Sequence, residues 1–218
     1  ASLVKDPCFW DAGGVTSNWS EAANWDSDTL PTGDDPILIR DADGEITVAN
    51  LDVSFDLNSK GSLTVAGGQT LNVTEGVTLR IANQSPGGSI WINGTLNLKG
   101  GTLHNHYTGL ITNRGTIIVT GGTLNNEGDS LVNMPGGRIN NVGGLIPHSA
   151  GAEFTNSGTV DNDAASNFVL GDLATFKNGG TFTNAGVFNT TSRSGDLVNQ
   201  KGGVLANSGT WNQDGVGV

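Results

Sequence analysis

A short phrase, an apolar residue followed two positions later by asparagine, recurs along this chain at nearly constant spacing. It returns in steps of 20 to 23 residues. Its apolar members are Trp91, Ile111, Leu131, Phe154, Phe176 and Leu197, and its asparagines are Asn93, Asn113, Asn133, Asn156, Asn178 and Asn199. Self-similarity at a fixed period of this size is the signature of stacked repeats, so the period constrains the fold more than any other feature.

Each repeat unit reads as short strands separated by turns. Residues 115–119 form a β-branched run, and the glycine pair within residues 120–124 separates it from the next run. That order is typical of strand, turn, strand, and no segment carries the apolar stripe of a helix. At about 3.3 Å per residue, one unit winds once round a narrow triangular cross-section. We therefore predict an all-β, single-stranded parallel β-helix (β-solenoid) with an N-terminal cap over residues 1–45 and the solenoid over residues 46–218.

Stacked coils place equivalent side chains above one another, so columns of like residues are expected. One predicted column holds the asparagines of the phrase, from Asn93 onward. A second pair of columns holds Ile139, Val160, Phe182 and Leu205, and beside them Asn141, Asn162, Asn184 and Asn207. Stacked amides donate to one neighbour and accept from the other, which satisfies polar groups inside the fold. The period favours this structural ladder over a role of these asparagines as ligand contacts.

Composition points outside the cytosol and away from nucleic acid. Charged residues make up only 14% of the chain, and glycine supplies 34 positions against 6 prolines. The formal net charge is -11, and residues 1–56 hold 12 of the 21 acids but only two bases. Without a basic stripe, nucleic acid is disfavoured as a partner. The single cysteine, Cys8, excludes an internal disulfide and leaves a small buried residue or an intermolecular disulfide.

The first 35 residues differ from the rest and hold three of the five tryptophans, Trp10, Trp19 and Trp25. The first coil of a solenoid exposes unpaired backbone and apolar core, which invites pairing with another chain. We expect these tryptophans to cover that end. The alternative is a carbohydrate-binding platform made of the same aromatic rings.

The same segment resembles the opening of secreted bacterial β-solenoid surface proteins, including autotransporter-type passengers. The residues that carry the resemblance are Trp10-Asp11-Ala12-Gly13-Gly14, Asn18-Trp19-Ser20, Ala23-Asn24-Trp25, Leu30-Pro31 and Asp34-Asp35-Pro36-Ile37-Leu38-Ile39, followed by Gly-rich strand repeats. The resemblance implies an extracellular or cell-surface location. The initial Ala is also consistent with a removed signal peptide, although another boundary would look the same, and no apolar run reaches the ~18 residues of a membrane span.

Acidic residues in the N-terminal segment form the candidate metal site of the sequence. The predicted calcium ligands are Asp26, Asp28, Asp34, Asp35, Asp41 and Asp43. Crowded hard oxygen ligands in loops suit calcium, although the full twelve-residue calcium loop is absent. The alternative is a solvated acidic surface.

Two further groups of residues give weaker indications of chemistry. Asp161, Asp163 and Asp172 with Lys177 are the candidate catalytic residues of a polysaccharide lyase or hydrolase, but chance surface acids explain them better. His104 and His106 alternate so as to point together, as a metal pair does. One coil away lie Asn125 and Glu127, so that Glu127 alone is available to complete a site. We expect no enzyme.

The favoured function is a structural protein of the cell surface or matrix that associates with itself head to tail into a filament. The residues expected to make this contact are Ala1, Ser2, Leu3, Val4, Trp211, Val216 and Val218. An extended N-terminal segment can add as a strand to a neighbour's open edge. The alternative from another class is an adhesin or glycan-binding module.

Overall fold

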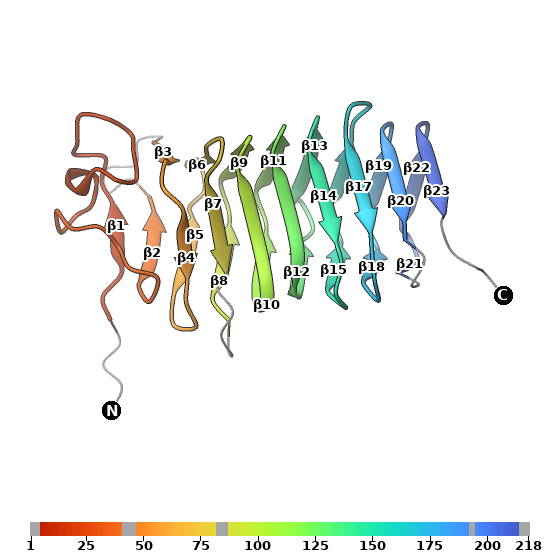
Figure 1. Cartoon of the computed structure of the whole chain (residues 1–218), viewed down its shortest axis with the longest axis horizontal. Helices are drawn as coiled ribbons and strands as arrows, with labels where there is room; N and C mark the ends of the chain where they lie inside the picture. Colours follow the sequence, from red (N-terminus) through yellow and green to blue (C-terminus); the bar gives the residue numbers. More distant parts are fainter. Residues whose placement is uncertain (1–4, 41–46, 82–86, 192–194, 214–218) are drawn as a thin grey trace.

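The chain folds as a β-solenoid of about 7 turns, which confirms the predicted fold class. The computed structural model describes residues 5–40, 47–81, 87–191 and 195–213. Within these ranges the only helical element is the 3₁₀ turn η1 (Ala22–Asn24), and no helix is long and apolar enough to cross a membrane. Figure 1 shows the strands following one another along the long axis, from β1 at one end to β23 at the other.

The coils have three faces, and parallel strands from successive coils pair within each face. The first face stacks β1 (Cys8–Trp10), β2 (Pro36–Ile39), β5 (Ser62–Val65), β8 (Ser89–Ile92), the second half of β10 (Thr102–Asn113), the second half of β12 (Thr123–Asn133), β15 (Glu153–Asn156), β18 (Thr175–Asn178) and β21 (Asp196–Asn199). The second stacks β3 (Val48–Leu51), β6 (Thr70–Val73), β9 (Thr95–Lys99), β11 (Thr116–Thr120), β13 (Arg138–Val142), β16 (Thr159–Asn162), β19 (Thr181–Asn184) and β22 (Val204–Asn207).

The third face stacks β4 (Phe55–Leu57), β7 (Thr78–Ile81), the first halves of β10 and β12, β14 (Leu145–His148), β17 (Asn167–Leu170), β20 (Val187–Thr190) and β23 (Thr210–Gln213). The long strands β10 and β12 turn the corner between the third and first faces without a break. They therefore join the two faces into one 15-stranded sheet.

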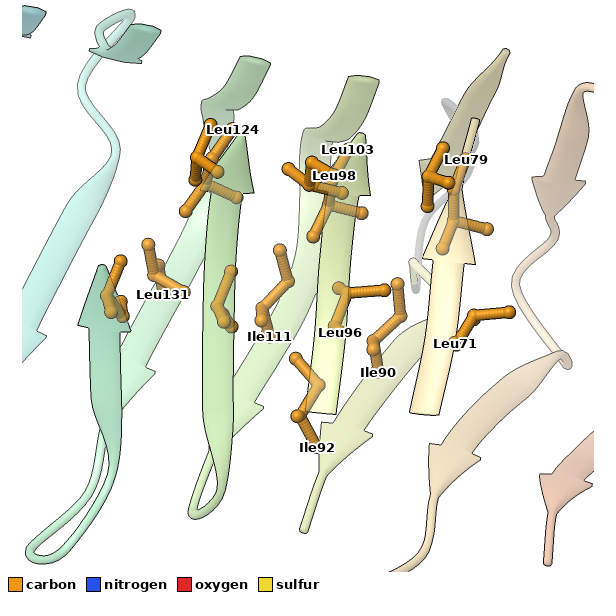
Figure 2. Packing of buried hydrophobic residues seen from close by; sticks show 14 of the residues in the cluster. Leu71, Leu79, Ile90, Ile92, Leu96, Leu98, Leu103, Ile111, Leu124 and Leu131 are labelled. Atoms are coloured by element: carbon orange, nitrogen blue, oxygen red, sulfur yellow. The ribbon is translucent and has the colours of Figure 1, made fainter. Parts of the chain in front are cut away.

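The core lies inside the coils because alternate residues of every strand point inward. Figure 2 shows leucine and isoleucine side chains, including Leu96, Ile111 and Leu131, packed between the strands of the three faces. Towards the C-terminal end the core becomes aromatic, and rings of successive coils pack on one another: Phe154 and Phe176 have centroids 4.8 Å apart, Phe168 and Phe188 5.4 Å. The periodic apolar positions of the sequence thus form one continuous core.

Two predicted asparagine ladders are present. In the first, Asn113, Asn133, Asn156 and Asn178 each donate through Nδ2 to Oδ1 of the next coil's asparagine at 2.8–2.9 Å, ending on Asn199. The second runs in the same direction from Asn141 through Asn162 and Asn184 to Asn207. Each amide that donates to the next asparagine also bonds a backbone carbonyl of the following coil, as Asn133 Nδ2 does with Thr159 O. The ladders therefore tie each coil from Asn113 onward to the coil that follows it.

The prediction that Asn93 begins the first ladder is wrong: Ile92 holds the inward position in that coil, and the ladder begins one coil later at Asn113. Asn113 pairs with Ile92, and Ile111 pairs with Ile90. Trp91 and Asn93 consequently face outward and are exposed. The earlier coils fill the same column with aliphatic Ile39 and Val65, so isoleucine continues that packing, whereas an inward Asn93 would lack an amide partner below it.

The N-terminal end is covered by the chain itself. Residues 24–26 pair with the outer edge of β1, where Asp11 N donates to Asn24 O at 2.9 Å and Asp26 N to Phe9 O at 3.0 Å. Residues 17–19 pair with the outer edge of β3, where Trp19 N donates to Asn50 O at 2.8 Å. Trp10, Trp19 and Trp25 are buried beneath this segment, so the expected aromatic cap is present. The predicted boundary at residue 45 lies outside the described residues.

Candidate functional site

A cluster of two histidines and a glutamate lies on the outer surface at the corner where β10 and β12 pass from the third face to the first. His104 and His106 belong to β10 and alternate with buried Asn105, so both point outward. In the strand register, His104 pairs with Asn125 and His106 pairs with Glu127 of the next coil. One ligand atom of each of His104, His106 and Glu127 lies within 4.8 Å of the other two.

Hydrogen bonds position the glutamate of this cluster. Its Oε2 lies 3.0 Å from His104 Nε2, and its Oε1 accepts from Asn125 Nδ2 at 3.2 Å. Burial alone raises the pKa of the Glu127 carboxyl, but the hydrogen bonds from Asn125 and His104 outweigh it and hold that pKa below its ordinary value. Glu127 is therefore a carboxylate at neutral pH.

His106 is the least satisfied member of the cluster. Within the described part of the chain its Nδ1 is buried and has no hydrogen-bond partner. Burial lowers the pKa of its imidazole, and the nearby His104 lowers it further. This shift favours the neutral imidazole, in which one ring nitrogen carries the proton and the other has a lone pair that can bind a metal ion.

A hollow of about 490 Å³ adjoins His106 and Glu127, and Tyr107, Gly128 and Ala150 contribute to its wall. Strand β10 carries one extra residue between Tyr107 and Leu110, which shifts its register with β12. Tyr107 adopts a φ of 52°, a left-handed conformation that is uncommon for a residue with a large side chain. Bulges of this kind re-aim side chains and are frequent beside functional sites.

The predicted calcium site does not assemble among the described residues. Asp26, Asp28, Asp34 and Asp35 do not bring three carboxylates together, and Asp41 and Asp43 lie outside the described residues. Asp35 instead pairs with Lys5 and accepts from Thr32 N at 2.7 Å. Asp26 accepts from Phe9 N at 3.1 Å, so these two carboxylates hold the cap's own loops together.

The candidate catalytic acids are dispersed. Asp161 on β16 pairs with Arg138 at 3.0 Å. Lys177 on β18 pairs with Glu153, and both of these lie on a different face from Asp161. Asp163 accepts from Ser166 Oγ and from Ala165 N within its own turn. These groups do not converge on one place.

The three cap tryptophans offer no ring face to a ligand. Trp10, Trp19 and Trp25 are 0–1% exposed, and their rings pack edge to face with centroids 4.6–5.2 Å apart. The alternative of a carbohydrate platform made from these rings is therefore wrong.

The opposite end of the solenoid presents an open coil, made of β21, β22 and β23. Within the described residues no strand pairs with their outer edges. Leu205 is 37% exposed, whereas its counterpart one coil earlier, Phe182, is 1% exposed. Trp211 stacks on Phe188 with centroids 4.4 Å apart and is only half-buried. Of the other expected contact residues, Ala1, Ser2, Leu3, Val4, Val216 and Val218 lie outside the described residues.

A third ladder was not predicted. Asn105 Nδ2 donates to Asn126 Oδ1 at 2.7 Å, and Asn126 Nδ2 donates to His148 Nδ1 at 2.9 Å. Burial lowers the pKa of His148, so its neutral ring accepts from the ladder and donates from Nε2 to Thr175 O at 3.0 Å. The signal was present in the sequence as a 21- to 22-residue spacing, but the change from asparagine to histidine obscured it.

Comparison with protein-family models, curated proteins and solved structures finds no match to this chain. The structure shows the β-solenoid fold of this chain alone. Membership of that group, secretion and a cell-surface location stay predictions.

Proposed function

We propose that this chain is a structural β-solenoid of the cell surface or extracellular matrix that joins end to end into a filament. The observation that carries the proposal is the difference between its two ends. One is sealed by the chain's own loops, and within the described residues the other leaves the outer edges of β21, β22 and β23 unpaired. A rigid body with two unlike ends is the unit from which a heterologous, repeating contact is built.

The backbone of the open coil supports strand pairing. In β22, Val204 N donates back to Gly180 O at 2.8 Å, and Ser208 N donates back to Asn184 O at 2.8 Å. In a parallel strand the intervening residues direct their backbone groups to the other side. The backbone N–H and C=O groups of Leu205 and Asn207 therefore point along the axis, away from β19. An edge of this kind is a template for a strand from another chain.

The side chains of the open coil support the same contact. Leu205 and Trp211 continue the internal core column beyond Phe182 and Phe188. Covering apolar surface is favourable by about 25 cal/mol per Å². We assign this position to the N-terminal segment of a second copy, in which Ala1, Ser2, Leu3 and Val4 add as a strand while the cap packs above.

The sides of the solenoid favour contact through the ends. The ladders and the core use the inward positions, and the outward positions of β16, β18 and β19 carry threonine, aspartate and lysine. Paired charges such as Arg138 with Asp161 cover part of this surface. The outward surfaces of these three strands gain little from contact with another copy.

Light scattering after size-exclusion chromatography and negative-stain electron microscopy, across a range of protein concentration, test the proposal. We expect wild-type protein to form end-to-end rods whose length grows with concentration, by mass action. Leu205→Lys places a charge on the open face and is expected to give monomers. Val204→Lys is the matched control, because Val204 lies on the same strand but points sideways and is 52% exposed.

Deletion of residues 1–4 separates this contact from other modes of association. The deleted protein is expected to remain folded, by circular dichroism, and monomeric. Uniform wild-type monomers at every concentration, or rods that persist equally in Leu205→Lys, defeat the proposal.

A further inference from the structure

We propose that His104, His106 and Glu127 bind one divalent first-row transition-metal ion, with zinc the best match, and leave a coordination position open toward the adjoining hollow. The proposal is independent of filament formation, since the cluster lies on the side of the solenoid at the corner of β10 and β12.

The distances suit such an ion after a small adjustment. Zinc binds imidazole nitrogen and carboxylate oxygen at about 2.0–2.1 Å, so neighbouring ligand atoms of a tetrahedral site lie about 3.3 Å apart. His104 Nε2 and Glu127 Oε2 are already 3.0 Å apart, and no ligand pair exceeds 4.8 Å. Closing the longest separation needs about 1.5 Å of movement, which rotation of the partly exposed side chains supplies.

The surroundings orient the ligands as a metal site requires. Asn125 donates to Glu127 Oε1 and so turns the other oxygen, Oε2, toward His104. Hydrogen bonds of this type around a metal fix the ligating carboxylate and strengthen binding. His106 has a buried Nδ1 that no described residue satisfies, and a buried polar atom without a partner needs an explanation. A rotation of the ring that brings a nitrogen to a metal removes this cost.

The donor set selects the class of metal. Two imidazoles and one carboxylate suit zinc, copper, nickel or iron, whereas calcium and magnesium prefer oxygen alone. The nearest cation in the strand register, Arg80, pairs with His104 across the previous coil. Its Nε is engaged by Asp56 at 3.1 Å, so the guanidinium does not occupy the Glu127 carboxylate.

The strained corner supplies the open side of the site. The extra residue in β10 and the left-handed Tyr107 carry the chain outward next to His106. A Cβ on the opposing Gly128 would lie 2.7 Å from Asn105 Cγ, so the corner requires glycine there. Backbone strain of this kind persists where the surroundings impose it, often at ligand sites. The hollow of about 490 Å³ has room for water or a small ligand at the fourth position.

Metal analysis of protein purified without a polyhistidine tag tests the inference. After equilibration with zinc and dialysis against metal-free buffer, we expect one zinc per wild-type chain by atomic emission spectroscopy. His106→Gln and Glu127→Gln are expected to lose that zinc. Asn125→Ala is expected to bind about 10- to 100-fold more weakly in calorimetric titration, because it removes only the supporting hydrogen bond.

Glu153→Gln is the matched control, because Glu153 is also a surface glutamate and its partner is Lys177 rather than a histidine. It is expected to retain full binding. Cobalt substitution adds a spectroscopic readout, in which a four-coordinate site gives strong visible absorption. Wild-type protein that retains no zinc, or equal retention by wild type and His106→Gln, overturns the inference.

Discussion

The two ends of the solenoid differ in how the outer strand edges and the core of the terminal coil are covered. At the N-terminal end, residues 17–19 and 24–26 pair with the first strands, and three tryptophans seal the core. At the other end, β21, β22 and β23 leave their outer edges unpaired within the described residues. The middle coils need neither device because each is covered by its neighbours. Stability in such a stack is nearly a sum of local and nearest-neighbour terms, so equivalent changes should cost different amounts at the two ends.

The largest difference is expected for the buried aromatic residues. Trp25→Ala should lower the free energy of unfolding by about 3–5 kcal/mol because its ring is fully buried. Trp211→Ala should cost about 1–2 kcal/mol because its ring is only partly covered. Urea unfolding followed by far-ultraviolet circular dichroism measures both. Trp25→Phe is the control, since it retains a ring but loses the 3.0 Å hydrogen bond from Nε1 to Trp19 O. Equal losses for Trp25→Ala and Trp211→Ala would contradict the comparison.

The ladder asparagines should show a smaller difference in the same direction. Asn162→Ala leaves Asn184 Oδ1 without its 2.7 Å donor and removes the bond to Val187 O, so we expect a loss of about 1–3 kcal/mol. Asn207 lies in the open coil, where water replaces lost partners, and Asn207→Ala should cost less than about 1 kcal/mol. The same unfolding measurement compares them, and a larger cost for Asn207→Ala would show that the last coil is covered.

The smallest expected effect is acid sensitivity of the N-terminal cap. Hydrogen bonds from the Thr16 hydroxyl and from the Val15 and Thr16 backbone lower the pKa of Glu21. Burial raises the pKa of Asp35, but Lys5 and Thr32 outweigh it and lower it overall. Stability from depressed carboxyl pKa values is complete above about pH 4 and is lost as the pH falls through the folded-state values.

Tryptophan fluorescence of a variant with Trp91→Phe and Trp211→Phe reports on the cap alone, because only Trp10, Trp19 and Trp25 remain. We expect the cap signal to change below about pH 4, while the far-ultraviolet signal of the coils persists. Adding Glu21→Gln should weaken the cap already at neutral pH and reduce the acid response. An unchanged acid response of the fluorescence in that variant would show that Glu21 does not contribute to the acid sensitivity of the cap.

Much of this architecture was predictable because a solenoid repeats one local solution. From Asn113 onward, the apolar residue and the asparagine two positions later both point inward, and every following coil offers the same pair. The start of the ladder was not predictable from the phrase alone. Ile90 and Ile92 alternate as well as Trp91 and Asn93 do, and only the aliphatic coils before them decide between the two.

The cluster of His104, His106 and Glu127 could be predicted only in part from the repeat. The alternation of His104 and His106 predicted that their side chains share a face, and the period brought Glu127 over His106. The contact of Glu127 with His104 is diagonal between two neighbouring coils, because the register pairs Glu127 with His106. It depends on the corner bulge and on Asn125, and neither the direction of a side chain at a bulge nor a cross-coil hydrogen bond follows from spacing.

The sequence by itself determined that the chain winds into stacked coils and which residues form the later columns, because like side chains at one period must lie above one another. Only the tertiary structure decided where the amide ladder begins, how the first coil is sealed and which three side chains meet at the β10 and β12 corner. Each of those depends on contacts between coils, where packing and hydrogen-bond partners choose among alternatives that the period leaves equal.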